Sequence, residues 1–131
     1  MKVLVTGAKG QLGSAAVRHC LKSGLTVVAV GRQGLDIVDE RKVAETIAAE
    51  KPDVIIHCAA YTNVDQAEAE PTEAFKVNVV GTRNLVSAAR IIGAKFVYVS
   101  TDYVFDGTAR KPLDEEQTTS PLGYMDNQTS W

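Results

Sequence analysis

The chain has 131 residues, of which 45% are hydrophobic and 23% charged, and its formal net charge is -2. This length suggests one domain that can bury a sizeable core without the help of disulfides or bound metals. The charge balance argues against nucleic acid as a main partner, and no apolar run approaches the roughly 18 residues of a membrane span. Cys20 and Cys58 follow no disulfide spacing, so we expect free thiols in a cytoplasmic protein.

Short apolar segments rich in β-branched residues alternate with segments of helical periodicity. The apolar segments predict buried parallel strands at 2–6, 26–30, 53–58 and 95–100, and a very short strand at 35–37. The periodic segments predict helices at 11–22, 39–50 and 71–92. This alternation is typical of βαβ units. The sequence therefore predicts an α/β fold, a Rossmann-like doubly wound parallel sheet, truncated, with strand order 3-2-1-4-5.

Individual residues mark the ends and the interior of these helices. We expect Gly24 to be the C-cap of the first helix and Asp39 to be the N-cap of the second. Gly81 inside the third helix costs about 1 kcal/mol relative to alanine, so we expect it to permit close packing. A polar loop at 106–120 follows the last strand.

A glycine-rich turn joins the first strand to the first helix. Gly7, Gly10 and Gly13 have G-x-x-G-x-x-G spacing, and not the G-x-G-x-x-G of the standard dinucleotide fingerprint. Their mechanical roles are similar, because one glycine allows the tight turn, another lets a pyrophosphate approach the backbone, and a third lets helix pack on strand. The alternative is a tight βα turn without a ligand. The position of the triplet in the first βαβ unit favours dinucleotide binding.

The residues after the second strand bear on cofactor choice. An acid at this point would favour NAD, whereas an arginine accommodates the 2′-phosphate of NADP. The chain has Arg32 here, and Lys9 in the glycine turn adds a second positive charge. Both residues favour NADP(H), with NAD(H) as the alternative cofactor. If they are only solvated surface cations, they carry no such information.

Four segments in order along the chain resemble one family. They span residues 5–13, 52–65, 78–85 and 100–107, and the last, Ser-Thr-Asp-Tyr-Val-Phe-Asp-Gly, is the most specific. Together they resemble the extended short-chain dehydrogenase/reductase superfamily, and more narrowly the dTDP-4-dehydrorhamnose reductases. The resemblance implies NADPH-dependent reduction of a dTDP-4-keto-6-deoxy sugar in dTDP-L-rhamnose synthesis. Related nucleotide-sugar epimerases and dehydratases remain an alternative.

The resemblance also implies a set of cofactor-binding residues. Beside Lys9 and Arg32, we expect Gly7, Gly10, Gln11 and Leu12 to lie along the pyrophosphate, and Asp36 and Ile37 to flank the adenine. Ala59, Ala60 and Tyr61 would line the nicotinamide side, and Asn78 would support a water-linked proton path. Asp36 has a simpler interpretation as the cap of a turn, and Asn78 as an exposed helix residue.

Catalytic residues follow from the same resemblance. Thr101 matches the catalytic Ser/Thr of the family, and Asp102 lies beside it on the substrate side. Alternatively, Thr101 is a strand-end hydroxyl bonded to backbone. The pairs His57-Cys58 and His19-Cys20 lack metal-ligand spacing, so we expect no metal site.

The expected proton donor and its lysine do not both occur. The family would show a tyrosine and, four residues later, a lysine that lowers the tyrosine pKa. If Tyr124 is the tyrosine, Gln128 holds the lysine position; in the next register, Met125 and Thr129 take the two places. We therefore name Tyr124 as the candidate donor without its usual partner.

This break in the pattern leads to a proposed organisation. We expect an NAD(P)-binding Rossmann domain at 1–123, a divergent tail at 124–131, and no C-terminal substrate domain, through truncation or a shift of reading frame. The chain is then an impaired reductase fragment or a non-catalytic NADP(H)-binding or regulatory module. The strand at 95–100 would become a sheet edge, which predicts self-association through that edge.

Overall fold

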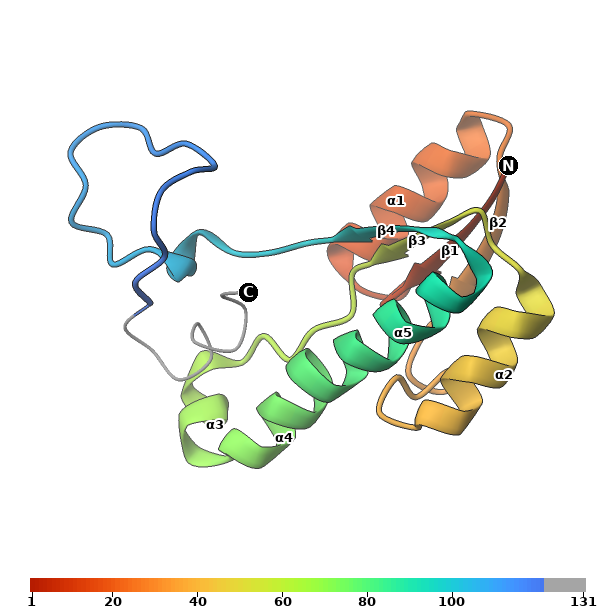
Figure 1. The fold of residues 1–131 in the computed structure, drawn as a ribbon, viewed down its shortest axis with the longest axis horizontal. Coiled ribbons are helices and arrows are strands. Elements are labelled where there is room, and N and C mark those ends of the chain that lie inside the picture. The colour runs from red at the N-terminus through yellow and green to blue at the C-terminus, as the bar shows by residue number, and fades with distance from the viewer. Residues whose placement is uncertain (122–131) are drawn as a thin grey trace.

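The structure, a computed structural model, describes residues 1–121 apart from the side chains of Val64 and Glu68. Its centre is a parallel sheet of four strands in the order β2-β1-β3-β4 (Figure 1). The strands are β1 (Lys2–Thr6), β2 (Thr26–Val30), β3 (Val54–His57) and β4 (Lys95–Tyr98). In the register, Val3 of β1 lies opposite Val27 on one side and Val54 on the other. The predicted fold class is confirmed.

The helices agree with the prediction at most ends. They are α1 (Gln11–Lys22), α2 (Glu40–Glu50), α3 (Val64–Ala69), α4 (Pro71–Phe75) and α5 (Thr82–Ile92), with a π-helical segment η1 (Lys76–Gly81) and a 3₁₀ turn η2 (Asp102–Val104). The long helix predicted at 71–92 is thus the succession of α4, η1 and α5. The short helix α3 was not predicted.

Two hydrophobic clusters lie on opposite faces of the sheet. Val3 and Val5 point to the α1 side, where they pack with Cys20. Leu4 and Ile55 point to the other side, which α2 and α5 cover (Figure 1). Successive strand residues alternate between faces, so a continuous apolar strand supplies both cores. Each such fully buried side chain contributes about 1.5–3 kcal/mol to folding.

The predicted third strand at 35–37 is wrong. The chain turns twice here: the N–H groups of Gly34 and Leu35 both donate to the Gly31 carbonyl at 2.9 Å, and the Asp39 N–H donates to the Asp36 carbonyl at 3.1 Å. Leu35 and Ile37 are buried in the α2–α5 core, without a strand partner. Their alternation with a polar residue therefore reflects two inward side chains of a loop. The other four strands keep the predicted order.

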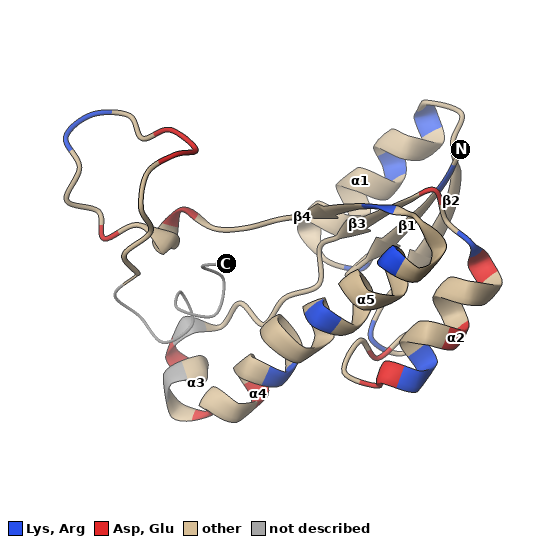
Figure 2. Ribbon diagram, viewed as in Figure 1, with Lys and Arg blue, Asp and Glu red and all other residues tan. Residues whose placement is uncertain are grey.

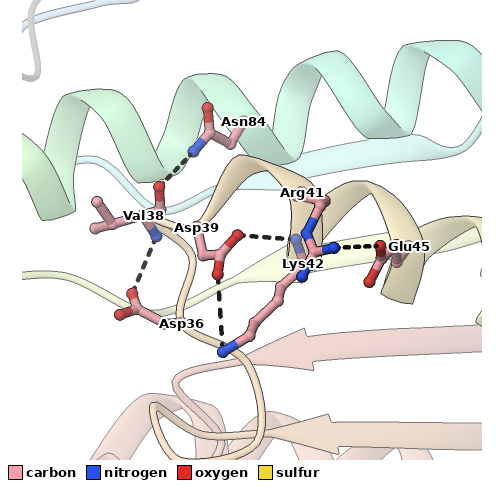
Figure 3. Close-up of polar contacts among 7 residues, drawn as sticks. All are labelled: Asp36, Val38, Asp39, Arg41, Lys42, Glu45 and Asn84. Carbon is pink, nitrogen blue, oxygen red and sulfur yellow. Dashed lines mark hydrogen bonds and ion pairs between the residues drawn. The ribbon is translucent and has the colours of Figure 1, made fainter.

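Local polar contacts fix the start of α2. The carboxylate of Asp39 accepts a hydrogen bond of 3.0 Å from the backbone N–H of Lys42, as an N-cap does (Figure 3). This bond is the main reason that the pKa of Asp39 is lowered. The predicted cap at Asp39 is confirmed, and Arg41 and Glu45 add an exposed i,i+4 pair at 3.8 Å.

The remaining segments lie away from the sheet. After β4 the chain leaves the sheet and forms a long irregular stretch, cyan to blue in Figure 1. Acidic and basic residues are interspersed on α2 and along this stretch, as Figure 2 shows. None of the helices within residues 1–121 has the length and apolarity needed to cross a membrane.

Candidate functional site

A cavity of about 280 Å³ opens at the carboxyl ends of the strands. Its walls come from the segments that follow β1, β2 and β3. Residues 31–37 and 58–61, which are far apart in sequence, both contribute to it. In this sheet β1 lies between β2 and β3, so the connections leave it in opposite directions. Open α/β sheets bind their ligands at such a switch point.

The glycine turn requires residues without a Cβ. Gly7 has a φ of 64°, and a Cβ placed on it would lie 2.7 Å from the backbone nitrogen of Ala59. A Cβ on Gly13 would meet the carbonyl group of Gly7, with 2.7 Å to its carbon. The turn, the start of α1 and the end of β3 therefore approach one another more closely than other residues allow. Gly7 and Gly10 line the cavity.

The N-terminus of α1 is free of side-chain caps. Gly10 is its N-cap residue, and no side chain accepts from its first turn. The first helical bond, 3.0 Å long, runs from the Ser14 N–H to the Gly10 carbonyl. Gln11 and Leu12 are exposed in this first turn. Backbone donors and the helix dipole at such an end suit an anion.

Two cations and one acid also line the cavity. Lys9 and Arg32 lie after β1 and β2, and neither makes an ion pair with another residue in the described range. The Lys9 ammonium donates to the Gln33 side chain at 3.4 Å. Asp36 accepts a hydrogen bond of 3.1 Å from the Val38 N–H, as in a turn (Figure 3). The turn-capping interpretation of Asp36 and its place in the cavity are thus compatible.

The wall formed by Asp36 and Ile37 is tied to α5. The buried amide of Asn84 donates to the carbonyl of Ile37 at 3.0 Å. It also donates to the carbonyl of Val38 at 3.2 Å (Figure 3). Asn84 was not predicted as a site residue. Its sequence neighbours form an ordinary amphipathic helix, and the partners lie more than forty residues away, so no local signal marks it.

The loop after β3 forms the opposite wall. Asn78 is buried, and its side chain both accepts from the Tyr61 N–H at 2.8 Å and donates to the Tyr61 carbonyl at 3.2 Å. The Tyr61 hydroxyl is buried and has no hydrogen-bond partner among the described residues. Burial, with Glu70 and Glu73 nearby, raises the pKa of Tyr61, so its hydroxyl is a neutral donor. A buried donor without a partner suits a ligand that accepts a hydrogen bond.

Thr101 and Asp102 lie beyond β4 at the start of η2, and they do not line the cavity. The Thr101 hydroxyl oxygen accepts from the Tyr103 N–H at 3.2 Å, and it faces the Asp102 carboxylate at 3.4 Å. The backbone contact expected in the alternative interpretation is therefore present. Tyr124 lies outside the described residues.

Most of the residues predicted to bind a cofactor meet in this cavity. They are Gly7, Lys9, Gly10, Arg32, Asp36, Ile37, Ala59, Ala60 and Tyr61. Gln11, Leu12 and Asn78 do not line it. Sequence reasoning missed the other lining residues, Thr6, Val30, Gly31, Leu35, Cys58 and Val77. Several of these are apolar residues adjacent to predicted ones, and their pattern resembles that of ordinary core residues.

Comparisons with known proteins agree with this geometry. The family model described as RmlD substrate binding domain matches residues 1–129. A dTDP-4-dehydrorhamnose reductase of Streptomyces griseus is 44% identical over 118 residues, which are 90% of this chain and 39% of that protein. The chain therefore spans well under half the length of this relative.

Solved structures give the same result. A crystal structure of a dTDP-4-dehydrorhamnose reductase from Clostridium acetobutylicum has a TM-score of 0.95 and 39% identity, covering 98% of this chain and 46% of that one. The corresponding protein of Bacillus anthracis, in complex with NADP, has a TM-score of 0.94 and 38% identity, with the same coverage.

Proposed function

The chain belongs to the RmlD substrate binding domain family, and we propose that it forms the NADP(H)-binding part of a dTDP-4-dehydrorhamnose reductase. Such an enzyme reduces a dTDP-4-keto-6-deoxy sugar in dTDP-L-rhamnose synthesis. The observation that carries the proposal is the cavity between the β1, β2 and β3 ends, with Lys9 and Arg32 on its rim. A relative with a TM-score of 0.94 is in complex with NADP.

The described residues fit this cofactor in three respects. The uncapped first turn of α1, reached through Gly7 and Gly10, suits the pyrophosphate, together with the backbone of Gln11 and Leu12. The two unpaired cations suit a 2′-phosphate. The neutral donor of Tyr61 suits a ribose or nicotinamide oxygen.

The remaining roles follow the shape of the cavity. Asp36 and Ile37 would hold the adenine, and Ala59 and Ala60 would lie beside the nicotinamide. Asn78 would act by fixing the Tyr61 backbone, because both ends of its amide are already bonded there. NAD(H) is the alternative ligand of the same cavity.

A ketone reduction at this site needs a hydride and a proton. NADP(H), when held by the residues of the cavity, would supply the hydride. The Tyr124 hydroxyl would donate the proton to the oxygen, the Thr101 hydroxyl would hold that oxygen, and Asp102 would contact the sugar. These three roles rest on the sequence pattern.

The second candidate is an NADP(H)-binding or regulatory module without turnover. The sequence favours it at one point, because Gln128 lies four residues after Tyr124 and a glutamine cannot lower a tyrosine pKa as a lysine does. In this case the domain at 1–123 binds cofactor, and the tail at 124–131 plays no catalytic part.

Cofactor binding is tested by fluorescence titration with NADPH and NADH. We expect wild type to prefer NADPH, and Arg32→Ala to weaken NADPH binding by roughly 10- to 100-fold, the worth of one charge-assisted contact, with NADH binding unchanged. Arg90→Ala, an exposed arginine in the last turn of α5, is the matched control and should leave both unchanged. Equal losses for both cofactors in Arg32→Ala would contradict the assignment of Arg32 to the 2′-phosphate.

Turnover separates the two candidate functions. Oxidation of NADPH with the dTDP-4-keto-6-deoxy sugar supports the reductase, whereas binding without oxidation supports the module. Gln128→Lys restores the charge four residues after Tyr124. If Gln128 is the reason that the protein binds NADPH without turnover, NADPH oxidation should appear or rise in Gln128→Lys.

Self-association through β4 is part of the proposal. β4 is the last strand of the described sheet, and Val97 and Val99 are 47% and 43% exposed on or just after it. A groove of about 350 Å³ lies on the α5 side of the same strand, lined by Val86 and Phe96 among others. Apolar sheet edges invite pairing with another chain.

Light scattering at increasing concentration tests this association. Val97→Lys should shift the population toward monomer, while Ile91→Lys, at an apolar residue exposed on α5, should not. A wild type that stays monomeric at high concentration would remove this part of the proposal.

We also place the protein in the cytoplasm, in agreement with the free thiols of Cys20 and Cys58.

A further inference from the structure

A buried histidine contacts Thr6 and precedes Cys58, which both line the cavity. His57 ends β3 and is only 1% exposed. Its Nδ1 atom lies 2.7 Å from the hydroxyl of Thr6 at the end of β1. Its Nε2 atom lies 3.0 Å from the hydroxyl of Thr82 at the start of α5. Both ring nitrogens are therefore engaged, each by a threonine from a different element.

The hydroxyl of Thr82 identifies the protonated nitrogen. The Thr82 hydroxyl donates its one hydrogen bond to the Asn78 carbonyl, 2.7 Å away. Its oxygen can therefore only accept a hydrogen bond from His57. Nε2 of His57 must then carry the hydrogen. In a neutral ring Nδ1 is consequently an acceptor, and the Thr6 hydroxyl donates a hydrogen bond to it.

The same bonds extend to both ends of the cavity loop. The Thr6 oxygen accepts from the Ala59 N–H at 3.4 Å. At the other end, Asn78 receives the bond of Thr82 on its carbonyl and holds the Tyr61 backbone with its amide. One chain of hydrogen bonds thus connects Ala59 and Tyr61, which both line the cavity, with His57 at its centre.

We propose that His57, as the neutral Nε2–H tautomer, is a positioning residue that holds residues 59–61 in place for the cofactor. The use of the cavity by a cofactor rests on the proposed function; the tautomer does not. The surroundings favour a neutral ring, since burial lowers the pKa of His57 to about 4. The rings of Phe96 and Tyr98 lie 5.9 and 5.8 Å from it and restrict its tilt.

The tautomer is tested first, by ¹⁵N NMR of the histidine ring in wild type without ligand. At pH 7 the spectrum should show a neutral His57 ring with its hydrogen on Nε2. An Nδ1–H tautomer, or a His57 ring that is protonated on both nitrogens at pH 7, would overturn the proposal. This result does not depend on whether NADPH binds.

The positioning role is tested by NADPH affinity in two pairs of variants. Thr82→Val removes the acceptor of Nε2 and should weaken NADPH binding about tenfold, while Thr82→Ser keeps the hydroxyl and should recover most of the affinity. His57→Leu and His57→Gln form the second pair, in which only glutamine offers both an acceptor and a donor. Thr72→Val, at an exposed threonine, is the control.

The outcomes separate this proposal from the proposed function. The positioning role is supported if NADPH affinity is lost in the apolar variant of a pair, Thr82→Val or His57→Leu, and recovered in its polar variant. One pair is sufficient if a variant of the other pair fails to fold. Affinity unchanged in Thr82→Val and His57→Leu, or lost equally in both members of each pair, overturns it. If wild type binds no NADPH, the positioning role falls with the proposed function, and the NMR result alone decides the tautomer.

Discussion

Asn84 on α5 donates a hydrogen bond of 3.0 Å from its side-chain amide to the backbone carbonyl of Ile37, which lies 47 residues earlier in the chain. The same amide reaches the Val38 carbonyl at 3.2 Å. The cavity wall at 36–37 has no strand partner, so this side chain replaces the hydrogen bonds that a sheet would provide. A helix on one face thereby fixes a loop of the site.

The Asn84 contact is expected to stabilise both the fold and the site. Asn84→Ala leaves two carbonyls without their donor and should lower the free energy of unfolding by about 1–3 kcal/mol. It should also weaken NADPH binding, because the wall at Asp36 and Ile37 loosens. Urea denaturation and cofactor titration measure the two effects. Ser87→Ala, at an exposed position of α5, should change neither by more than about 0.5 kcal/mol; an equally small effect of Asn84→Ala would contradict the prediction.

Gly81 permits the close contact between η1 and the same loop. A Cβ on Gly81 would lie 2.6 Å from both Cγ1 and Cδ1 of Ile37. Alanine favours helices by about 1 kcal/mol over glycine, yet we expect Gly81→Ala to destabilise by about 1–3 kcal/mol, because the overlap outweighs propensity.

A double-mutant cycle tests whether Ile37 is the cause of that cost. Ile37→Ala removes both Cγ1 and Cδ1, so the Gly81→Ala and Ile37→Ala double variant should be more stable than the sum of the single effects predicts. Additive effects in urea denaturation would show that another contact of Gly81 limits the packing.

The sequence predicted the elements whose signals are local. β1, α1 and β2 agree to the residue, because apolar β-branched runs, helical periodicity and glycines mark their ends. The strand predicted at 35–37 was wrong, because two inward side chains separated by a polar residue resemble a strand whether or not a partner strand exists. Asn84 and the threonines beside His57 act across long sequence separations, which leave no periodic trace.

The buried His57 should make the stability depend on pH. Burial lowers its pKa from 6.5 to about 4 in the folded protein, so the unfolded chain binds more protons between these values. The stabilising contribution is complete above pH 6.5 and is lost as pH falls toward 4. The shift corresponds to about 3 kcal/mol. Urea denaturation from pH 7 to pH 4 measures it.

The variant His57→Gln isolates the histidine from other acid-sensitive groups. Glutamine does not titrate in this range, so its stability should fall less steeply between pH 6.5 and 4 than that of wild type. The carboxylates, including the N-cap Asp39, contribute equally in both proteins. Parallel pH profiles would mean that His57 is not held neutral by burial.

The variants Gly13→Ala and Gly24→Ala distinguish two reasons for a glycine, a close backbone approach and a left-handed backbone conformation. A Cβ on Gly13 meets the Gly7 carbonyl, and backbone cannot move aside as a side chain can. Gly24 has a φ of 72°, but nothing lies within 4 Å of a Cβ placed there. Gly13→Ala should therefore cost about 3 kcal/mol or more and impair NADPH binding, because the turn that carries Gly7 must shift. Gly24→Ala should cost only about 1–2 kcal/mol, the strain of a left-handed residue, and keep wild-type NADPH affinity. Urea denaturation and NADPH titration of the two variants distinguish these effects, and a Gly13→Ala protein that binds NADPH as wild type does would mean that α1 need not approach the Gly7 turn this closely.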